Sequence, residues 1–370
     1  MKTCNYCLMD ESAADIIFDM SGRCNYCKDM TERLKRISSD SEDILQLKLN
    51  KLVKDIKYKG NGKPYDCIVG LSGGADSAYA LYLACKNGLR PLAVHMDNGW
   101  NSELAVNNIE SLVKTFKVDL FTYVVNWREY RKLQQAFFDA DVIDIELLYD
   151  NAMLAVNYDL AKKYNIEYIL SGSNSTTEGM RVPSNFNWYK FDRKNIKSIA
   201  SSSNLKVTSL PTIGVMKYLW RRAVNRIKWV HFLDYTDYDK SKCIDLLVKE
   251  CGYRPYPYKH YESIFTRFYQ GYILPTKFGV DKRKMHLSSL ICSGQMSRVD
   301  AVKLISQSPY PNIVDLEADL EYFLKKMDWS ENDLLGYINR PAQSHAKYAS
   351  ESYLYEYARS LFNFLKSTNR

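Results

Sequence analysis

The chain has 370 residues, 46% of them hydrophobic, and a formal net charge of +8 from 51 Lys and Arg against 43 Asp and Glu. This length predicts two or three domains with a sizeable core. No apolar run approaches the roughly 18 residues that a membrane-spanning helix needs. The start, MKTCNYCLMD, lacks the apolar segment of a secretory signal. We therefore expect a protein that makes no membrane contact.

The cysteine content and the net charge further limit the class of protein. Nine cysteines, four of them in close pairs, favour metal binding in a reducing compartment over disulfides, which predicts a cytoplasmic location. The positive charge suits RNA and a small anionic substrate, such as a nucleotide sugar, equally well. Charge alone therefore does not select the partner.

Two cysteine pairs near the N-terminus, Cys4-x2-Cys7 and Cys24-x2-Cys27, are separated by sixteen residues. Each pair can close on one face of a tight knuckle, and together they supply four thiolates for a tetrahedral Zn²⁺ ion. A site with four protein ligands leaves no position open for chemistry, so we expect structural zinc in a ribbon over residues 1–30. A redox function is disfavoured because neither pair opens a helix in a βαβ context.

Residues 31–61 predict a charged helical linker that ends at the break Gly60-Asn61-Gly62. Its apolar residues are spaced for one helix face. They are Leu34, Ile37, Leu45, Leu49, Leu52 and Ile56.

From residue 62 to 235 the pattern alternates between strands and helices, which predicts a doubly wound parallel α/β sheet. Its first unit, YDCIVGLSGGADSAY, reads as a buried strand, a glycine turn and a helix N-terminus. Such a turn brings backbone N–H groups and the positive end of a helix dipole to one point, which suits a phosphate. Further strands are expected at 91–96, 120–125 and 167–171, and helices at 102–116, with Asn101 or Ser102 as the cap, and 151–164.

Ligands in such sheets bind beyond the carboxyl ends of the strands. Three segments lie at such ends: the SGGADS loop, HMDNGW over 95–100 and SGSNSTTEG over 171–179. In the second, Asp97 and Asn98 could bond nucleotide amino and hydroxyl groups. The third is short, polar and bounded by glycines. Each of the last two could be an ordinary loop, but together the three predict a site.

Residues 181–235 leave two interpretations open. Trp188, Trp220 and Trp229, with neighbouring arginines, could form a nucleic-acid surface of aromatics and cations. The favoured alternative is an amphipathic helix at 215–230 whose arginines extend around a packed core.

The C-terminal region, 236–370, predicts a mostly helical domain that completes the site. Its segment 277–298, KFGVDKRKMHLSSLICSGQMSR, concentrates positive charge. It is either a solvated basic face or a basic element that reaches over the ATP phosphates, where a fixed cation would stabilise the charge of adenylylation.

The SGGADS string resembles the signature of the PP-loop ATP pyrophosphatases (a HUP-like fold), and a Walker A lysine is absent. The cysteine ribbon, GLSGGADSA, VHMDNGWNSE, SGSNSTTEG and the basic segment together resemble the N-acetyl sugar amidotransferase family of PP-loop enzymes. The resemblance covers roughly residues 1–300. It implies conversion of a sugar acetamido group to an acetamidino group, with Mg-ATP split into AMP and pyrophosphate, in bacterial surface-glycan synthesis (lipopolysaccharide O-antigen or nonulosonates).

The resemblance also implies roles for individual residues. Those expected to bind ATP and pyrophosphate are Gly70, Ser72, Gly73, Gly74, Asp76, Ser77, Asp97, Asn98, Ser171 and Gly172. Asp76 would also help to place Mg²⁺, Lys277 and Arg283 would be transition-state cations, and Asp281 would orient them. Asn174, Thr176 and His286 are expected to contact the acceptor, an acetamido sugar that is expected to be nucleotide-linked.

No cysteine stands at position 2, and Cys292 is not flanked by glycines on both sides, so a built-in glutaminase is not expected. The resemblance implies ammonia from a separate pair of proteins similar to the glutaminase and barrel subunits of imidazole-glycerol-phosphate synthase. Two alternatives stay open. One is a tRNA-modifying enzyme of the thiolase or lysidine synthetase type, although nucleic acid is the less favoured partner; the other is a zinc scaffold without activity.

Overall fold

A computed structural model describes residues 1–38, 41–256, 261–310 and 312–357. Its centre is a five-stranded sheet in the order β3-β2-β1-β4-β5, in which every neighbouring pair is parallel. This confirms the predicted fold class. The strands are β1 (Cys67–Gly70), β2 (Pro91–Asp97), β3 (Leu120–Val124), β4 (Tyr168–Ser171) and β5 (Lys228–His231).

The three central strands are buried on both faces, which explains their nearly continuous apolar sequences. In β1, Val69 packs toward one face with Leu170 of β4, while Ile68 packs toward the other with Ile169. Successive side chains of a strand alternate between faces, so one short run supplies both cores.

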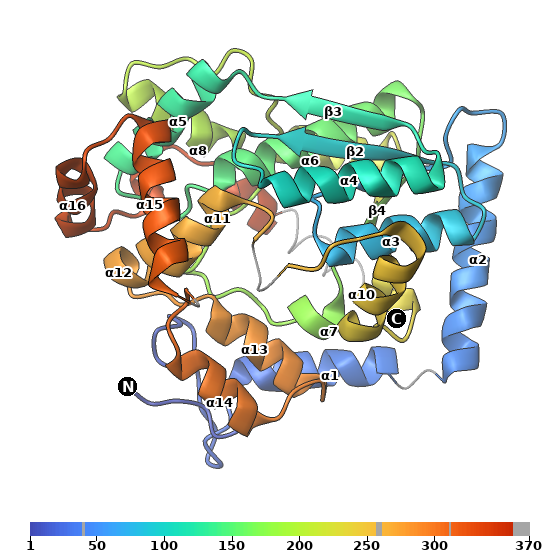
Figure 1. Cartoon of the computed structure of the whole chain (residues 1–370), viewed down its shortest axis with the longest axis horizontal. Helices are drawn as coiled ribbons and strands as arrows, with labels where there is room; N and C mark the ends of the chain where they lie inside the picture. Colours follow the sequence, from blue (N-terminus) through green and yellow to red (C-terminus); the bar gives the residue numbers. More distant parts are fainter. Residues whose placement is uncertain (39–40, 257–260, 311, 358–370) are drawn as a thin grey trace.

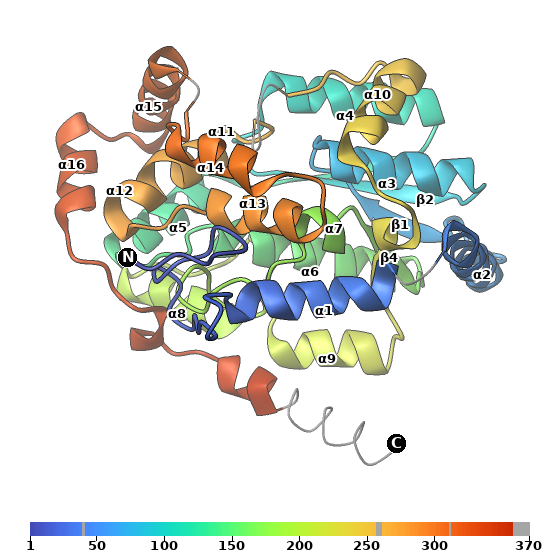
Figure 2. The same ribbon diagram turned by 90° about the horizontal axis from the view of Figure 1, so that it is seen from below.

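Helices cover both faces of the sheet, with α3, α4 and α10 on one side and α6 and α9 on the other (Figures 1 and 2). This arrangement brings the carboxyl ends of β1, β2 and β4 to one edge. The helices of this part are α3 (Ala75–Lys86), α4 (Glu103–Phe116), α5 (Trp127–Asp139), α6 (Leu147–Lys163), α7 (Ser175–Glu178), α8 (Arg193–Ser202), α9 (Val215–Ala223) and α10 (Lys240–Cys251).

A third core lies beside the sheet and is rich in aromatic side chains, with Trp100, Phe138 and Phe323 fully buried in it. It joins α5 and α8 to the C-terminal helices, so the C-terminal region packs on the α/β part. The C-terminal helices are α11 (Ile264–Phe268), the π-helix η2 (Tyr269–Ile273), α12 (Leu274–Phe278), α13 (Arg283–Cys292), α14 (Arg298–Ser306), α15 (Ile313–Met327) and α16 (Glu331–Asn339).

The predicted linker contains two separate helices, α1 (Asn25–Ser38) and α2 (Glu42–Gly60). Helix α2 packs on the sheet through Leu49, Val53 and Ile56, while α1 continues from the cysteine ribbon and lies against α13 (Figure 2). Within the described residues, no helix combines the length and apolar character that crossing a membrane requires.

One predicted element is wrong: the segment 215–230 is not a single helix. Helix α9 ends at Ala223, Arg226 adopts a positive φ of 55°, and Trp229 lies in β5, paired with β4. The backbone of β5 forms its hydrogen bonds with β4 at the edge of the sheet. The spacing of apolar residues in the sequence does not show this pairing. Arg221 is only 8% exposed and bonds Asp159. The packing interpretation of this segment is therefore favoured.

Candidate active site

The SGGADS loop follows β1 and leads into the first turn of α3. Gly73 has a φ of +88°, and a Cβ there would lie 2.9 Å from the Cβ of Ala105 in α4, so glycine is required for both reasons. Ser77 Oγ accepts a hydrogen bond from the Ser72 N–H at 3.2 Å. Gly74 caps α3 without a side-chain bond, which leaves the first N–H groups of the helix available to an anion.

Asp76 is held by two groups that the sequence analysis missed. The hydroxyl of Tyr238 donates to Asp76 Oδ1, and Lys240 Nζ lies 3.1 Å from Oδ2. Burial lowers the pKa of Lys240, but the negative charge of Asp76 outweighs it and raises the pKa above its usual value. The Lys240 ammonium group therefore stays charged and lies beside the SGGADS loop. Lys240 follows the cap of α10, and no local motif marks it.

The second loop, after β2, is fixed by its own side chains. His95 Nδ1–H donates to the carbonyl of Leu71 at 2.8 Å, and its Nε2 accepts from Asn101 Nδ2 at 2.9 Å. Asp97 accepts from Asn101 as well, at 3.2 Å. Burial lowers the pKa of His95, which keeps the ring neutral and able to accept. His95 is therefore a positioning residue that ties this loop to the SGGADS loop.

The third loop, 171–179, lies beside the first two. Gly172 packs on the start of α3, where an added Cβ would come within 2.5 Å of the Asp76 carbonyl carbon. Asn174 is buried and caps α7 by accepting from the Thr177 N–H at 2.7 Å, so its role is structural in this arrangement. The residues of this loop that reach the cavity are Ser173, Thr177 and Glu178, not the predicted Asn174 and Thr176.

The predicted C-terminal cations have different positions. Lys277 is wholly buried: it pairs with Asp141 at 3.0 Å and donates to the carbonyls of Tyr337 and Arg340. The structure therefore does not bring Lys277 to the cavity, which argues against the catalytic role expected of it. Arg283 does line the cavity, and its guanidinium donates to the carboxylate of Asp281 at 2.7–3.1 Å.

A cavity of about 900 Å³ connects these segments. Its wall near the SGGADS loop includes Ser72, Asn98, Asn101, Ser173 and Thr177. The part of its lining that comes from the C-terminal region includes Arg267, Gln270, Lys282, Arg283, His286 and Ser308. Of the predicted residues, Ser72, Asn98, Arg283 and His286 thus share one cavity. Gly70, Gly73, Gly74, Ser77, Asp97, Ser171 and Gly172 shape the loops behind its wall.

Acidic and basic groups are paired inside this cavity. Lys282 Nζ lies 2.9 Å from Glu146 Oε2, which also accepts from Gln270 Nε2 at 2.9 Å. Burial raises the pKa of Glu146, but the positive charge of Lys282 outweighs it and the pKa falls below its usual value. His286 Nδ1–H donates to the carbonyl of Thr177, 3.1 Å away. Lys282 belongs to the basic segment 277–298 but was assigned no role there, and Glu146 was not singled out in the sequence.

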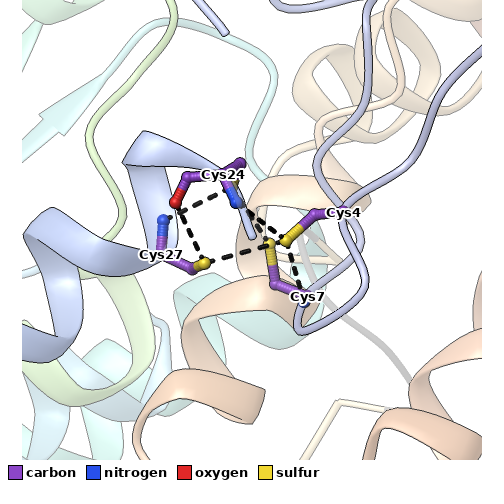
Figure 3. A group of neighbouring side chains, drawn as sticks. All are labelled: Cys4, Cys7, Cys24 and Cys27. Carbon is purple, nitrogen blue, oxygen red and sulfur yellow. Dashed lines mark hydrogen bonds between the residues drawn. The ribbon is translucent and has the colours of Figure 1, made fainter. Parts of the chain in front are cut away.

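The four cysteines of the ribbon converge on one buried point (Figure 3). The Sγ atoms of Cys4 and Cys27 are 3.7 Å apart, and those of Cys7 and Cys24 are 3.6 Å apart. Four thiolates about 2.3 Å from a tetrahedral Zn²⁺ ion would be about 3.8 Å from one another. The donor set and its spacing therefore fit zinc.

The ribbon packs on two elements of the cavity wall, α13 and the segment after α7. The Leu8 N–H donates to Ser288 Oγ at 3.0 Å, and Lys284 Nζ pairs with Asp10 at 2.5 Å. Met180, which lines the cavity, packs into the apolar cluster around the cysteines. The ribbon therefore supports the cavity wall.

Comparison with known proteins adds one decisive observation. Residues 262–362 match the family described as "LPS biosynthesis protein WbpG-like, C-terminal domain". The C-terminal part of the chain is similar to this WbpG-like domain. The matched residues contain α11 to α16 and include the C-terminal part of the cavity lining.

Each of the other similarities covers part of the chain. The uncharacterized protein MJ1599 of Methanocaldococcus jannaschii is 39% identical over 89 residues, which are 23% of this chain and 31% of that protein. Among solved structures, the NH3-dependent NAD synthetase of Campylobacter jejuni covers 45% of this chain and 75% of its own, with 18% identity and a TM-score of 0.29. The NMN synthetase of Francisella tularensis covers 58% and 94%, with 15% identity and a TM-score of 0.31.

Proposed function

We propose that this protein is an ATP-dependent amidotransferase that converts an acetamido group of a sugar into an acetamidino group. The observation that carries the proposal is the shared cavity: Ser72 of the SGGADS loop and residues of the WbpG-like domain both line it. A phosphate-binding loop beside a domain described for lipopolysaccharide biosynthesis fits a synthetase of bacterial surface glycans, either O-antigen or nonulosonates.

The proposed reaction has two steps. The amide oxygen of the acceptor attacks the α-phosphorus of ATP, and the bond to pyrophosphate breaks. Ammonia then adds to the activated carbon and loses protons, and the carbon–oxygen bond breaks to release AMP. An amide is a poor electrophile, and adenylylation turns its oxygen into a good leaving group, so no covalent enzyme intermediate is needed. Positioning and charge stabilisation supply the rate enhancement.

The chain offers groups for each requirement. The N–H groups of the SGGADS loop and the start of α3 would hold pyrophosphate, with Lys240 as the nearby cation. Mg²⁺ would neutralise the phosphates, and Asp76 would help to hold it. Across the cavity, Lys282 and His286 face the space in which the acceptor amide would lie.

We propose that ammonia comes from a separate glutaminase pair, similar to the subunits of imidazole-glycerol-phosphate synthase. All nine cysteines are described, and none lines the cavity. The cavity thus offers no thiol for glutamine hydrolysis or for sulfur transfer to RNA. The ribbon is a candidate docking surface for this pair.

Mass spectrometry of a reaction with Mg-ATP, ammonium and a panel of acetamido nucleotide sugars and nonulosonates tests the proposal. The expected product has NH in place of one oxygen, with one AMP formed per product. If the whole panel stays unchanged while the protein binds tRNA in a salt-sensitive manner, the proposal is wrong and RNA modification replaces it.

A further inference from the structure

Two tyrosine hydroxyls donate to one backbone carbonyl of the SGGADS loop. The hydroxyl of Tyr253 lies 3.2 Å from the Gly73 oxygen, and the hydroxyl of Tyr256 lies 3.0 Å from it. A carbonyl oxygen has two lone pairs, so it can accept both hydrogen bonds. Burial raises the pKa of each tyrosine above its usual value, which keeps both hydroxyls protonated and able to donate.

The segment that carries these tyrosines is fixed to helix α4. Buried Asn108 of α4 uses both ends of its amide on Arg254, which lies between the two tyrosines in the chain. Its Oδ1 accepts from the Arg254 N–H, and its Nδ2 donates to the Arg254 carbonyl, both at 2.9 Å. Ser111, one turn further along α4, donates its hydroxyl to the Cys251 carbonyl at 2.5 Å. The two tyrosine hydroxyls therefore come from a segment that has its own fixed position.

The carbonyl that they hold belongs to the peptide unit between two glycines. Gly73 has a positive φ, and neither Gly73 nor Gly74 has a Cβ that would restrict rotation of this unit. In a planar trans peptide the C=O and N–H groups point to opposite sides. The direction of the Gly73 carbonyl therefore sets the direction of the Gly74 N–H, and a half-turn of the unit would exchange the two groups.

The observed orientation directs this N–H group to the side of the loop on which a phosphate would bind. The Gly74 N–H donates to Ser72 Oγ at 3.2 Å, and Ser72 lines the cavity. A phosphate oxygen would bind the same N–H more strongly than a neutral hydroxyl does, because charge-assisted hydrogen bonds are roughly twice as strong. A reversed peptide unit would instead present a carbonyl oxygen, which repels an anion. The two tyrosine donors oppose this reversal.

We propose that Tyr253 and Tyr256 are positioning residues for the phosphate-binding loop, which hold the Gly73–Gly74 peptide unit with its N–H toward the pyrophosphate part of ATP. Neither tyrosine belongs to the described lining of the cavity, so both act through the peptide unit. The assignment rests on the proposed function in one respect, the binding of ATP phosphates by this loop. It does not depend on the identity of the acceptor.

Calorimetric titration of the full chain with inorganic pyrophosphate and Mg²⁺ tests the proposal. Tyr253→Phe and Tyr256→Phe each keep the ring and leave one hydroxyl on the carbonyl, so each should raise the dissociation constant by less than about twofold. The double variant has no donor left and should bind pyrophosphate about tenfold or more weakly, which exceeds the product of the single effects. Unchanged binding by the double variant, or an effect equal to that product, would overturn the proposal.

Tyr123→Phe is the matched control. Tyr123 of β3 also donates its hydroxyl to a backbone carbonyl, that of Ser209 at 2.7 Å, and neither residue belongs to the described lining of the cavity. This variant should bind pyrophosphate as tightly as the unaltered protein. A loss as large as that of the double variant would show that removal of any such hydroxyl weakens binding, and would contradict the proposal.

If the double variant does not fold, a crystal structure of the unaltered protein with magnesium pyrophosphate decides. A phosphate oxygen within about 3.2 Å of the Gly74 nitrogen is expected, with both hydroxyls still bonded to the Gly73 carbonyl. A reversed peptide unit, or pyrophosphate bound elsewhere, contradicts the proposal. Failure of the proposed function looks different: the tyrosines control pyrophosphate binding, but no acetamidino product forms. Conversely, product formation by the double variant with an unaltered KM for ATP removes this assignment and retains the activity.

Discussion

Lys240 Nζ lies 3.1 Å from Asp76 Oδ2, although 164 positions separate the two residues in the chain. The pair joins the start of α10 to the first turn of α3, directly behind the SGGADS loop. Under the proposed function, Lys240 would lie beside pyrophosphate and Asp76 would help to hold Mg²⁺.

Replacing Lys240 with Met should lower the rate of pyrophosphate release by about 100-fold or more, because a fixed cation that stabilises transferring phosphate is lost. Pyrophosphate release with Mg-ATP, acceptor and ammonium is the measurement. Lys242→Met is the control: Lys242 is exposed on the same helix and should retain the full rate. Equal rates in the two variants would show that Lys240 only supports the fold.

Asp76→Ala should abolish pyrophosphate release and leave zinc content and the fold intact. Asp76→Asn separates charge from shape, because the amide can still accept from Tyr238 while it loses the charge that pairs with Lys240. We expect both variants to be inactive, with far-ultraviolet circular dichroism unchanged. Retained turnover in either would refute the placement of the site at this loop. Asp237→Asn, at an exposed position nearby, is the control.

The local structure of short motifs could be predicted from the sequence, because residues close together in the chain determine it. The loop from Ser72 to Ser77 closes through hydrogen bonds among its own residues. The paired cysteines likewise predicted a cluster that the structure contains. Both features could be expected from sequence alone.

Residues that tertiary packing brings to the site could not be found in this way. Lys277 and Lys282 are five positions apart in one basic segment, and composition does not separate them. Gly279, with a φ of +65°, ends α12 between them and redirects the chain. Lys277 therefore pairs with buried Asp141, whereas Lys282 reaches the cavity and Glu146. Arg267 could not be identified from the sequence either, because its partner Asp319 is 52 positions away.

Gly172→Ala should displace the start of α3, because the new Cβ would meet the Asp76 carbonyl carbon at 2.5 Å and the Ser77 nitrogen at 2.6 Å. Backbone atoms cannot move aside cheaply, so we expect a loss of about 1–3 kcal/mol in the free energy of unfolding and weaker ATP binding. Denaturant unfolding and calorimetry with ATP measure the two effects. Gly336→Ala is the control, because an added Cβ there meets no atom within 4 Å. Wild-type stability and affinity in Gly172→Ala would contradict this packing.

Cys24→Ser should remove the metal and loosen α13, because the ribbon holds that helix through the Leu8–Ser288 bond and the Asp10–Lys284 pair. Metal analysis should find one zinc per chain in the unaltered protein and much less in the variant. Hydrogen exchange should rise in residues 283–292. Cys85→Ser, on α3, should change neither quantity. Normal zinc content in Cys24→Ser would overturn the four-cysteine assignment.

His345 should make stability depend on pH. Burial lowers the pKa of its ring to about 4, although the charge of Asp144 opposes this shift. The neutral ring fits its surroundings: Nε2 accepts from the Asp144 N–H at 3.2 Å, and Nδ1–H donates to Asn195 Oδ1 at 2.8 Å. Protonation would destroy the first of these bonds.

Because the pKa of His345 in the folded state lies below the value of about 6.5 in an unfolded chain, the unfolded state binds more protons between these values. The stabilisation by neutral His345 is therefore complete above about pH 6.5 and is lost as the pH falls toward 4, by about 3 kcal/mol in total. His345→Gln keeps an acceptor but cannot titrate. Its free energy of unfolding should fall less than that of the unaltered protein between pH 7.5 and pH 4.5. Parallel pH profiles of the two proteins would show that His345 is not the titrating group.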